Sequence, residues 1–170
     1  NPEKVINQWE VIKEQISFSE IGILVRINLY NNLCYANFLL QRYKEAVFFL
    51  NKIIYYKGDI SYLIQTVARM MLLIIRFETK DIEALQYNVR TTRRWLLKNG
   101  LLGEFEKRVL RFFETDILKV NKKSSFIQLK EDILKINVQR KHNILGFFDI
   151  KIWIEAKIQN RKYIDLVAGK

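Results

Sequence analysis

Residues 29–46 read LYNNLCYANFLLQRYKEA, and they form two helical segments separated by the two-residue break Gln41-Arg42. Apolar side chains recur at helical spacing on both sides of this break, and neither segment contains glycine or proline. Two small residues, Cys34 and Ala46, stand one on each segment, where they allow neighbouring helices to approach closely. Because so short a connection forces the helices to run antiparallel, the stretch predicts an α-helical hairpin.

The same stretch resembles a tetratricopeptide repeat (TPR). The resemblance is carried by an aromatic, a leucine and a small residue on the first helix and by Tyr-x-x-Ala on the second: Tyr30, Leu33, Cys34, Tyr43 and Ala46. The sequence departs from the TPR pattern in Asn37, where an aromatic is common, and in the lack of a closing proline. The resemblance implies an all-α, right-handed stack of antiparallel helical hairpins, a TPR-like superhelix with a concave binding groove.

Helical periodicity continues on both sides of this hairpin and predicts about seven to nine helices. The expected helices cover residues 5–16, 19–41, 43–55, 61–79, 82–98, 103–119, 126–138 and 145–159, with a short one in 160–167. Gly58 and Gly100 are placed to end helices, Asp81 to cap the helix at 82–98, and Ser124 or Ser125 to cap the helix at 126–138.

The short connections predict a single TPR-like domain over residues 1–170. The clearest repeat unit is 28–54, and a degenerate unit follows at 67–92. The helices within 126–167 are expected to cap the stack, since a repeat array needs a cover for its last core face. The helix at 5–16 resembles the second helix of a preceding hairpin, so we expect the chain to be a fragment of a longer protein.

The composition is that of a globular, helical chain that carries a strong positive charge. Of 170 residues 49% are hydrophobic, one is proline, and the net charge is +11. Residues 1–85 hold 10 Lys and Arg against 9 Asp and Glu, whereas residues 86–170 hold 19 against 9. We therefore expect an acidic partner to bind the C-terminal half.

Several classes of function are disfavoured by the residues present. The longest apolar run, 70–75, is too short to span a membrane. One cysteine, Cys34, forms no disulfide within the chain, and we expect a cytoplasmic protein. With His142 as the single histidine, we expect no metal site, no cofactor and no enzymatic activity.

The TPR resemblance places a groove along the first helix of each hairpin. Its expected lining on the two helices comprises Asn28, Asn31, Tyr35, Phe38, Arg69, Met70, Ile74 and Phe77. Asparagine amides bind peptide backbone, and arginine binds carboxylates. The alternative is that the C-terminal helix, with Phe148, Ile152 and Trp153, fills this groove.

A basic patch is expected on the helices at 82–98 and 103–119. Its members are Arg90, Arg93, Arg94, Lys98, Lys107, Arg108 and Arg111. Such a face suits nucleic acid, an acidic protein segment or anionic lipid, and the alternative is an ordinary solvated face interleaved with Glu104 and Glu114.

Two functional hypotheses follow. The first is a non-catalytic scaffold that binds another protein or a peptide in the helical groove. The second is a domain that binds nucleic acid or another polyanion through its basic half.

Overall fold

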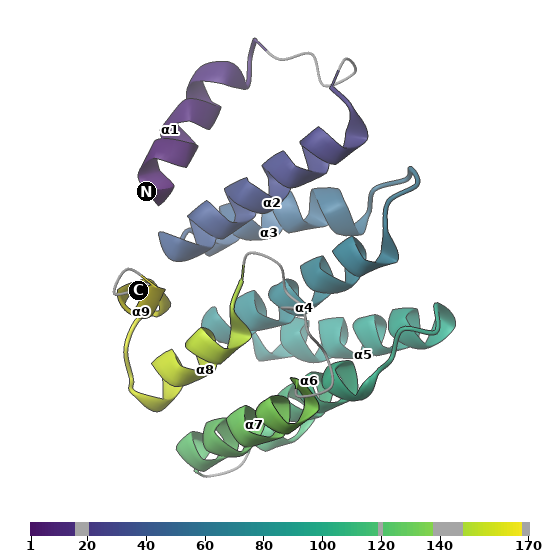
Figure 1. Ribbon diagram of the computed structural model, residues 1–170, viewed down its shortest axis with the longest axis vertical. Helices are drawn as coiled ribbons and strands as arrows, with labels where there is room; N and C mark the ends of the chain where they lie inside the picture. Colours follow the sequence, from purple (N-terminus) through teal and green to yellow (C-terminus); the bar gives the residue numbers. More distant parts are fainter. Residues whose placement is uncertain (16–20, 119–120, 138–147, 168–170) are drawn as a thin grey trace. The chain divides into compact units, whose positions relative to one another are not determined.

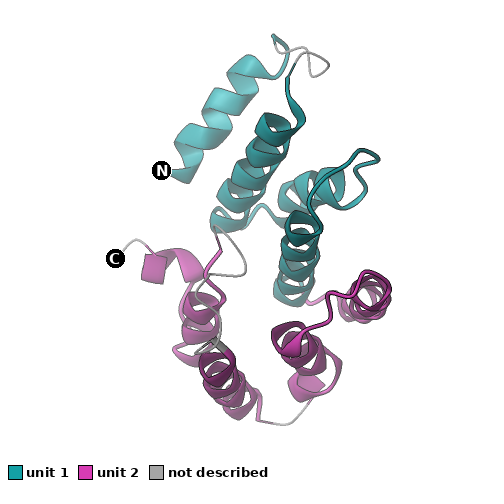
Figure 2. Cartoon of the chain, turned by 45° about the vertical axis from the view of Figure 1, so that its right-hand side comes forward, with its two compact units in different colours: residues 1–79 teal, residues 80–170 magenta. Residues whose placement is uncertain are grey.

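The computed structural model describes residues 1–15, 21–118, 121–137 and 148–167. Within these ranges the chain is all-α: nine α-helices and one 3-10 helix pack mainly on their neighbours in sequence, which confirms the expected class and helix number. The chain divides into two compact units, residues 1–79 and 80–170 (Figure 2).

Unit 1 consists of α1 (Pro2–Ile12), α2 (Ile23–Leu39), α3 (Tyr43–Ile54) and α4 (Tyr62–Glu78), each packed on the next (Figure 1). The hairpin expected within 29–46 is present as α2 and α3. Its two small residues, Cys34 and Ala46, are only 3% and 0% exposed, as expected for residues that let two helices approach closely.

Helix α4 is the most deeply buried helix of unit 1. All six residues from Met70 to Ile75 are buried, so this part of the helix is covered on every side. Such burial needs an almost wholly apolar helix, and the sequence of this run meets that need.

Unit 2 consists of α5 (Ile82–Lys98), α6 (Glu104–Glu114), the 3-10 helix η1 (Asp116–Leu118), α7 (Lys122–Asn137), α8 (Ile150–Ile158) and α9 (Tyr163–Val167). Its core is built around Trp153 of α8, which is fully buried. The Trp153 ring lies 5.5 Å from Phe126, 6.1 Å from Phe113 and 6.5 Å from Phe112, measured between centroids. Four aromatic rings therefore hold α6, α7 and α8 together.

The helix ends confirm some of the expected signals. Gly100 has φ 67°, and the amides of Gly100 and Leu101 donate to the carbonyls of Leu97 and Leu96, as in a Schellman motif. The side chain of Asp81 caps α5 by accepting from the amide of Ala84 at 3.1 Å.

Two expected helix-end signals were wrong. Gly58 does not adopt positive φ, because α3 already ends at Ile54 with Tyr55 as its C-cap. Helix α7 begins at Lys122, before the serines expected to cap it. The Asn121 side chain accepts instead from the amide of Ser124 at 3.1 Å, and the Ser125 hydroxyl donates to the carbonyl of Asp116.

Candidate partner-binding site

The four groove residues expected on α2 differ in how much surface they offer. Asn28 is exposed, whereas Asn31 and Tyr35 are half-buried. Phe38 is only 4% exposed, and its ring packs edge-on against Tyr43 at 5.9 Å. Phe38 therefore supports the α2–α3 contact and has little surface for a ligand.

The groove residues expected on α4 are also largely enclosed. Met70 and Ile74 are both 0% exposed, so they belong to the core. Arg69 and Phe77 are half-buried, and burial lowers the pKa of the Arg69 guanidinium, partly offset by Tyr55. Neither residue lines the cleft between α1 and α2.

A cleft of about 400 Å³ lies between α1 and α2. Apolar side chains from both helices form most of its wall, and Tyr35 is the one expected groove residue among them. The lining residues are Asn1, Pro2, Val5, Gln8, Trp9, Ile12, Leu29, Asn32, Tyr35, Ala36 and Leu39.

The cleft exists because α1 packs incompletely on unit 1. Only Ile6 of α1 is buried, although Val5, Trp9 and Ile12 follow the spacing of a core-facing stripe. These three residues are half-buried and line the cleft instead. The spacing of these residues shows which face of α1 is apolar, but it does not show how completely that face is covered.

A second cleft, of about 340 Å³, lies between α1 and the α2–α3 hairpin. Trp9 lines both clefts, and its ring meets Phe49 edge-on at 6.0 Å. The polar groups Glu10, Arg42 and Glu45 stand around this second cleft. Helix α1 is thus flanked by open space on two sides.

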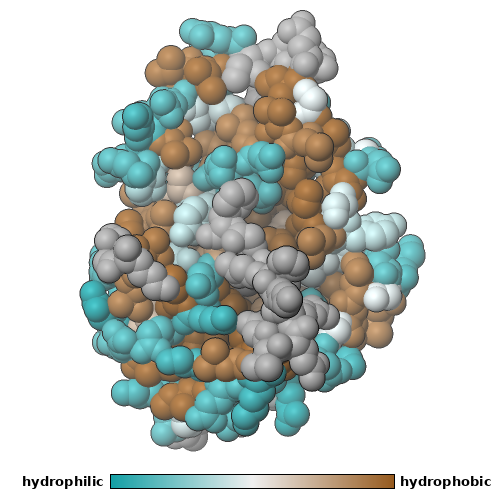
Figure 3. Space-filling view, in the orientation of Figure 1, coloured by the Kyte–Doolittle hydropathy of each residue, from teal (hydrophilic) through white to brown (hydrophobic). Residues whose placement is uncertain are grey.

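Unit 1 carries a large amount of exposed apolar surface outside the clefts. In Figure 3 apolar side chains gather over α2, α3 and the start of α4. Among the described residues of this unit, the exposed large hydrophobic ones are Val11, Leu24, Val25, Phe48, Tyr55, Tyr62 and Leu63, each at least 55% exposed. Apolar surface of this extent is typical of proteins that bind other proteins.

The expected basic patch divides into paired and unpaired residues. Arg93 forms a two-pronged ion pair with Glu114, with its Nε at 3.0 Å and its Nη2 at 2.6 Å from the carboxylate oxygens. Lys107 lies 2.8 Å from Glu104 on the same helix. Each of these pairs neutralises the charge of one residue of the expected basic patch.

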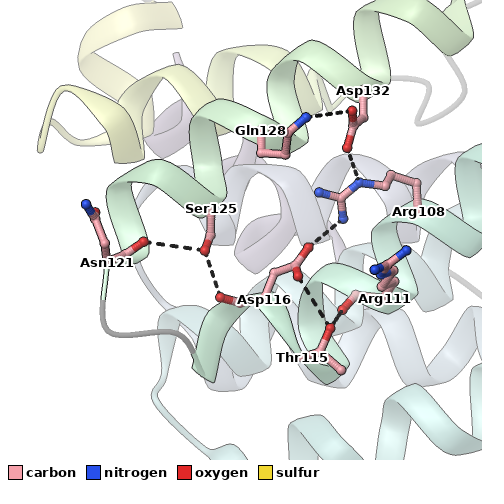
Figure 4. A network of polar contacts seen from close by, with 8 residues as sticks. All are labelled: Arg108, Arg111, Thr115, Asp116, Asn121, Ser125, Gln128 and Asp132. Atoms are coloured by element: carbon pink, nitrogen blue, oxygen red, sulfur yellow. Dashed lines mark hydrogen bonds and ion pairs between the residues drawn. The ribbon is translucent and has the colours of Figure 1, made fainter.

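Arg108 is also removed from the patch, because it joins three elements of unit 2 (Figure 4). Its Nη1 lies 2.9 Å from Asp116 of η1, and its Nε lies 2.6 Å from Asp132 of α7. The side chains of Arg108 and Asp116 are only 12% and 8% exposed. Gln128 donates to the second oxygen of Asp132 at 2.9 Å, so both oxygens of this carboxylate accept a hydrogen bond.

The other four patch residues, Arg90, Arg94, Lys98 and Arg111, are exposed. Their side chains form no ion pair or hydrogen bond with any residue that the structure describes. The first three lie on α5 and Arg111 lies on α6, so all four are available to a partner.

The C-terminal helix was the alternative occupant of the groove, and two of its expected residues have partners within unit 2. Trp153 is enclosed by the aromatic core of unit 2, and Phe148 stacks on Tyr163 at 4.9 Å. Both rings are therefore held within the unit to which they belong.

Chemistry-bearing groups are sparse in the described residues. No group of three or more His, Cys, Asp or Glu side chains there is arranged to hold a metal ion, and His142 lies outside the described ranges. Burial raises the pKa of the Cys34 thiol to about 12, which keeps the thiol protonated. None of the helices described has the length and apolar character that a bilayer span requires.

No protein-family model, curated protein or solved structure matches this chain. The described residues form an all-α arrangement of sequentially packed helices for which no family is identified.

Proposed function

We propose that this protein is a non-catalytic interaction module that holds an apolar segment of a partner protein in the cleft between α1 and α2. The observation that carries the proposal is the apolar stripe of α1, which its neighbours cover only in part. Val5, Trp9 and Ile12 face a space of about 400 Å³, a volume typical of ligand sites.

The cleft has the composition of a peptide-binding site. Aromatic rings of Trp9 and Tyr35 offer a large contact area at low cost in conformational entropy, and such residues dominate binding energies at protein interfaces. The amides of Gln8 and Asn32 are exposed at the cleft and form no hydrogen bond within the described chain, so they suit a peptide backbone.

A TPR-like architecture is part of this proposal. In this architecture α2 and α3 are one repeat of a right-handed stack, supported by the tight α2–α3 break and by the buried small residues Cys34 and Ala46. A cytoplasmic location, inferred from the single cysteine, is part of the same proposal.

A matched pair of substitutions on α2 tests the cleft. Asn32 and Asn28 are both exposed and stand one turn apart, but only Asn32 lines the cleft. In Asn32→Trp the indole fills the cleft, and Asn28→Trp adds the same ring outside it. Peptides selected on the full chain from a random library are then measured by fluorescence anisotropy against both variants.

We expect Asn32→Trp to weaken the selected peptides by about tenfold or more and Asn28→Trp to change their affinity by less than about threefold. Equal effects of the two substitutions, or none, would show that the cleft is not the binding site. Circular dichroism of both variants confirms that they remain folded.

A further inference from the structure

The outer face of α5 combines positive and apolar side chains. The buried stripe of this helix is formed by Leu85, Val89, Thr92 and Leu96. The opposite face, the α5 outer face, consists of six exposed residues: Glu83, Tyr87, Arg90, Arg94, Leu97 and Lys98. Tyr87 and Leu97 are 59% and 60% exposed, so the face offers apolar surface beside its charges.

Three of the unpaired cations among the described residues of unit 2 lie on this face. Residues 80–170 hold 20 Lys and Arg against 11 Asp and Glu, a net charge of +9. The carboxylates of Glu114 on α6 and Asp132 on α7 are engaged by other cations, Arg93 and Arg108. No described carboxylate pairs with the three cations of the α5 outer face.

The spacing of these cations suits a helical partner. Arg90, Arg94 and Lys98 follow each other at four-residue intervals, so they are separated by about 6 Å along the helix axis. Carboxylates at four-residue intervals on a second helix have the same repeat. Two helices packed side by side would therefore keep every charge pair in register, as charged positions do in coiled coils.

The apolar residues of the face favour a protein partner over nucleic acid. Leu97, next to Lys98, offers no ring on which a base could stack, so it adds apolar surface of a kind that a protein partner buries. Both Leu97 and Tyr87 can instead bury apolar side chains of an amphipathic helix.

We propose that the α5 outer face binds an acidic amphipathic helix of a partner protein. This surface lies in unit 2 and shares no residue with the α1–α2 cleft. The proposal therefore goes beyond the proposed function and stands or falls independently of it.

The test uses the full chain and three labelled probes in fluorescence anisotropy. The first probe is a synthetic helical peptide with Glu at every fourth position and a parallel stripe of Leu. The second is a scrambled peptide of identical composition, and the third is a single-stranded oligonucleotide with the same number of negative charges.

Two charge-reversal variants separate the α5 outer face from general electrostatics. One is the triple variant Arg90→Glu, Arg94→Glu and Lys98→Glu. Its control, Lys122→Glu, Lys123→Glu and Lys135→Glu on α7, makes the same change in net charge at three other exposed positions. A third variant, Leu97→Ser, removes apolar surface and no charge.

We expect the amphipathic peptide to bind about tenfold tighter than either other probe. The α5 reversal should weaken its binding by about tenfold or more, the α7 reversal by less than about threefold, and Leu97→Ser by about fivefold. Each of these variants is checked by circular dichroism for an unchanged helical content.

Three results would overturn the proposal: no binding of the amphipathic peptide, equal or tighter binding of the oligonucleotide or scrambled peptide, or equal losses in the α5 and α7 reversals. Tighter binding of the oligonucleotide would identify a nucleic-acid surface instead, with a steep dependence of affinity on salt.

Discussion

At the residue scale, burial determines the reactivity of the Cys34 thiol. Cys34 of α2 is 3% exposed, and burial raises the pKa of its thiol from 9.0 to about 12. A thiol that stays protonated is a poor nucleophile, so we expect Cys34 to act as a small packing residue and to react slowly with thiol reagents in the native state.

The raised pKa of Cys34 predicts a loss of stability in alkali. Above pH 9.0 the unfolded chain releases the thiol proton while the folded chain keeps it until about pH 12, so the free energy of unfolding falls between these values. The expected slope is roughly 1.4 kcal/mol per pH unit. Urea denaturation at about pH 8 and about pH 10.5 measures this slope.

The control for this prediction is Cys34→Ala, which keeps a small side chain and has no proton to lose. Its stability should fall less steeply over the same pH range. Some slope remains, because burial and the nearby Glu78 raise the pKa of Tyr43 to about 12. Identical slopes for the two proteins would contradict the assignment to Cys34.

At the scale of single elements, three helices end with a residue in the left-handed conformation, and the strain of this conformation depends on the residue type. The ends of α2, α5 and α8 share one hydrogen-bond pattern, with a left-handed residue after each C-cap: Gln41, Gly100 and Asn160. At α5 this residue is glycine, which adopts the conformation without strain. At α2 it is Gln41 with φ 58°, where a Cβ atom is unfavourable.

Substitution of Gln41 by glycine is therefore expected to stabilise the protein. The gain should be on the order of 1 kcal/mol, because relief of the left-handed strain exceeds the added entropy of the unfolded chain. The reverse change, Gly100→Gln, should cost a similar amount, since no heavy atom lies within 4 Å of an added Cβ and only the backbone opposes it. Thermal unfolding of both variants measures the two effects, and a lower melting temperature for Gln41→Gly would refute the argument.

At the scale of the molecule, unit 2 is joined across its helices by one aromatic cluster and one polar network. Trp153 brings together the rings of three helices, and Arg108 links α6, η1 and α7 through Asp116 and Asp132 (Figure 4). Partial burial works to raise the pKa of Asp132, but hydrogen bonds from Arg108 and Gln128 outweigh it and hold this pKa below its ordinary value.

Removal of the Arg108 side chain should destabilise the protein by about 3 kcal/mol, because it leaves the Asp116 carboxylate buried without its cation. Arg108→Lys should recover only part of the loss, since an ammonium group lacks the planar fork that contacts two carboxylates. Urea unfolding followed by tryptophan emission measures both changes.

The matched control is Arg111→Ala, an exposed position on the same helix, which should change stability by less than about 0.5 kcal/mol. Comparable losses at positions 108 and 111 would mean that the network contributes little to folding.

The chain itself determined the helices and the hairpin within 29–46, since apolar periodicity, turn residues and helix caps act within a few residues of one another. The expected range 82–98 matches α5 residue for residue. The start of α7 was missed because Asn121 and the contact of Ser125 with η1 shift it towards the N-terminus.

Only the tertiary structure decided which of these side chains are available to a partner. Arg94 and Arg108 are equivalent in a sequence, yet one is exposed and the other is held by a carboxylate 24 residues away. The cleft likewise depends on how α1 packs, because a helical stripe is equally apolar whether its neighbour covers it fully or partly. Charge pairing and surface coverage depend on contacts between residues that are far apart in the chain. A local sequence pattern does not contain these contacts, so it cannot predict them.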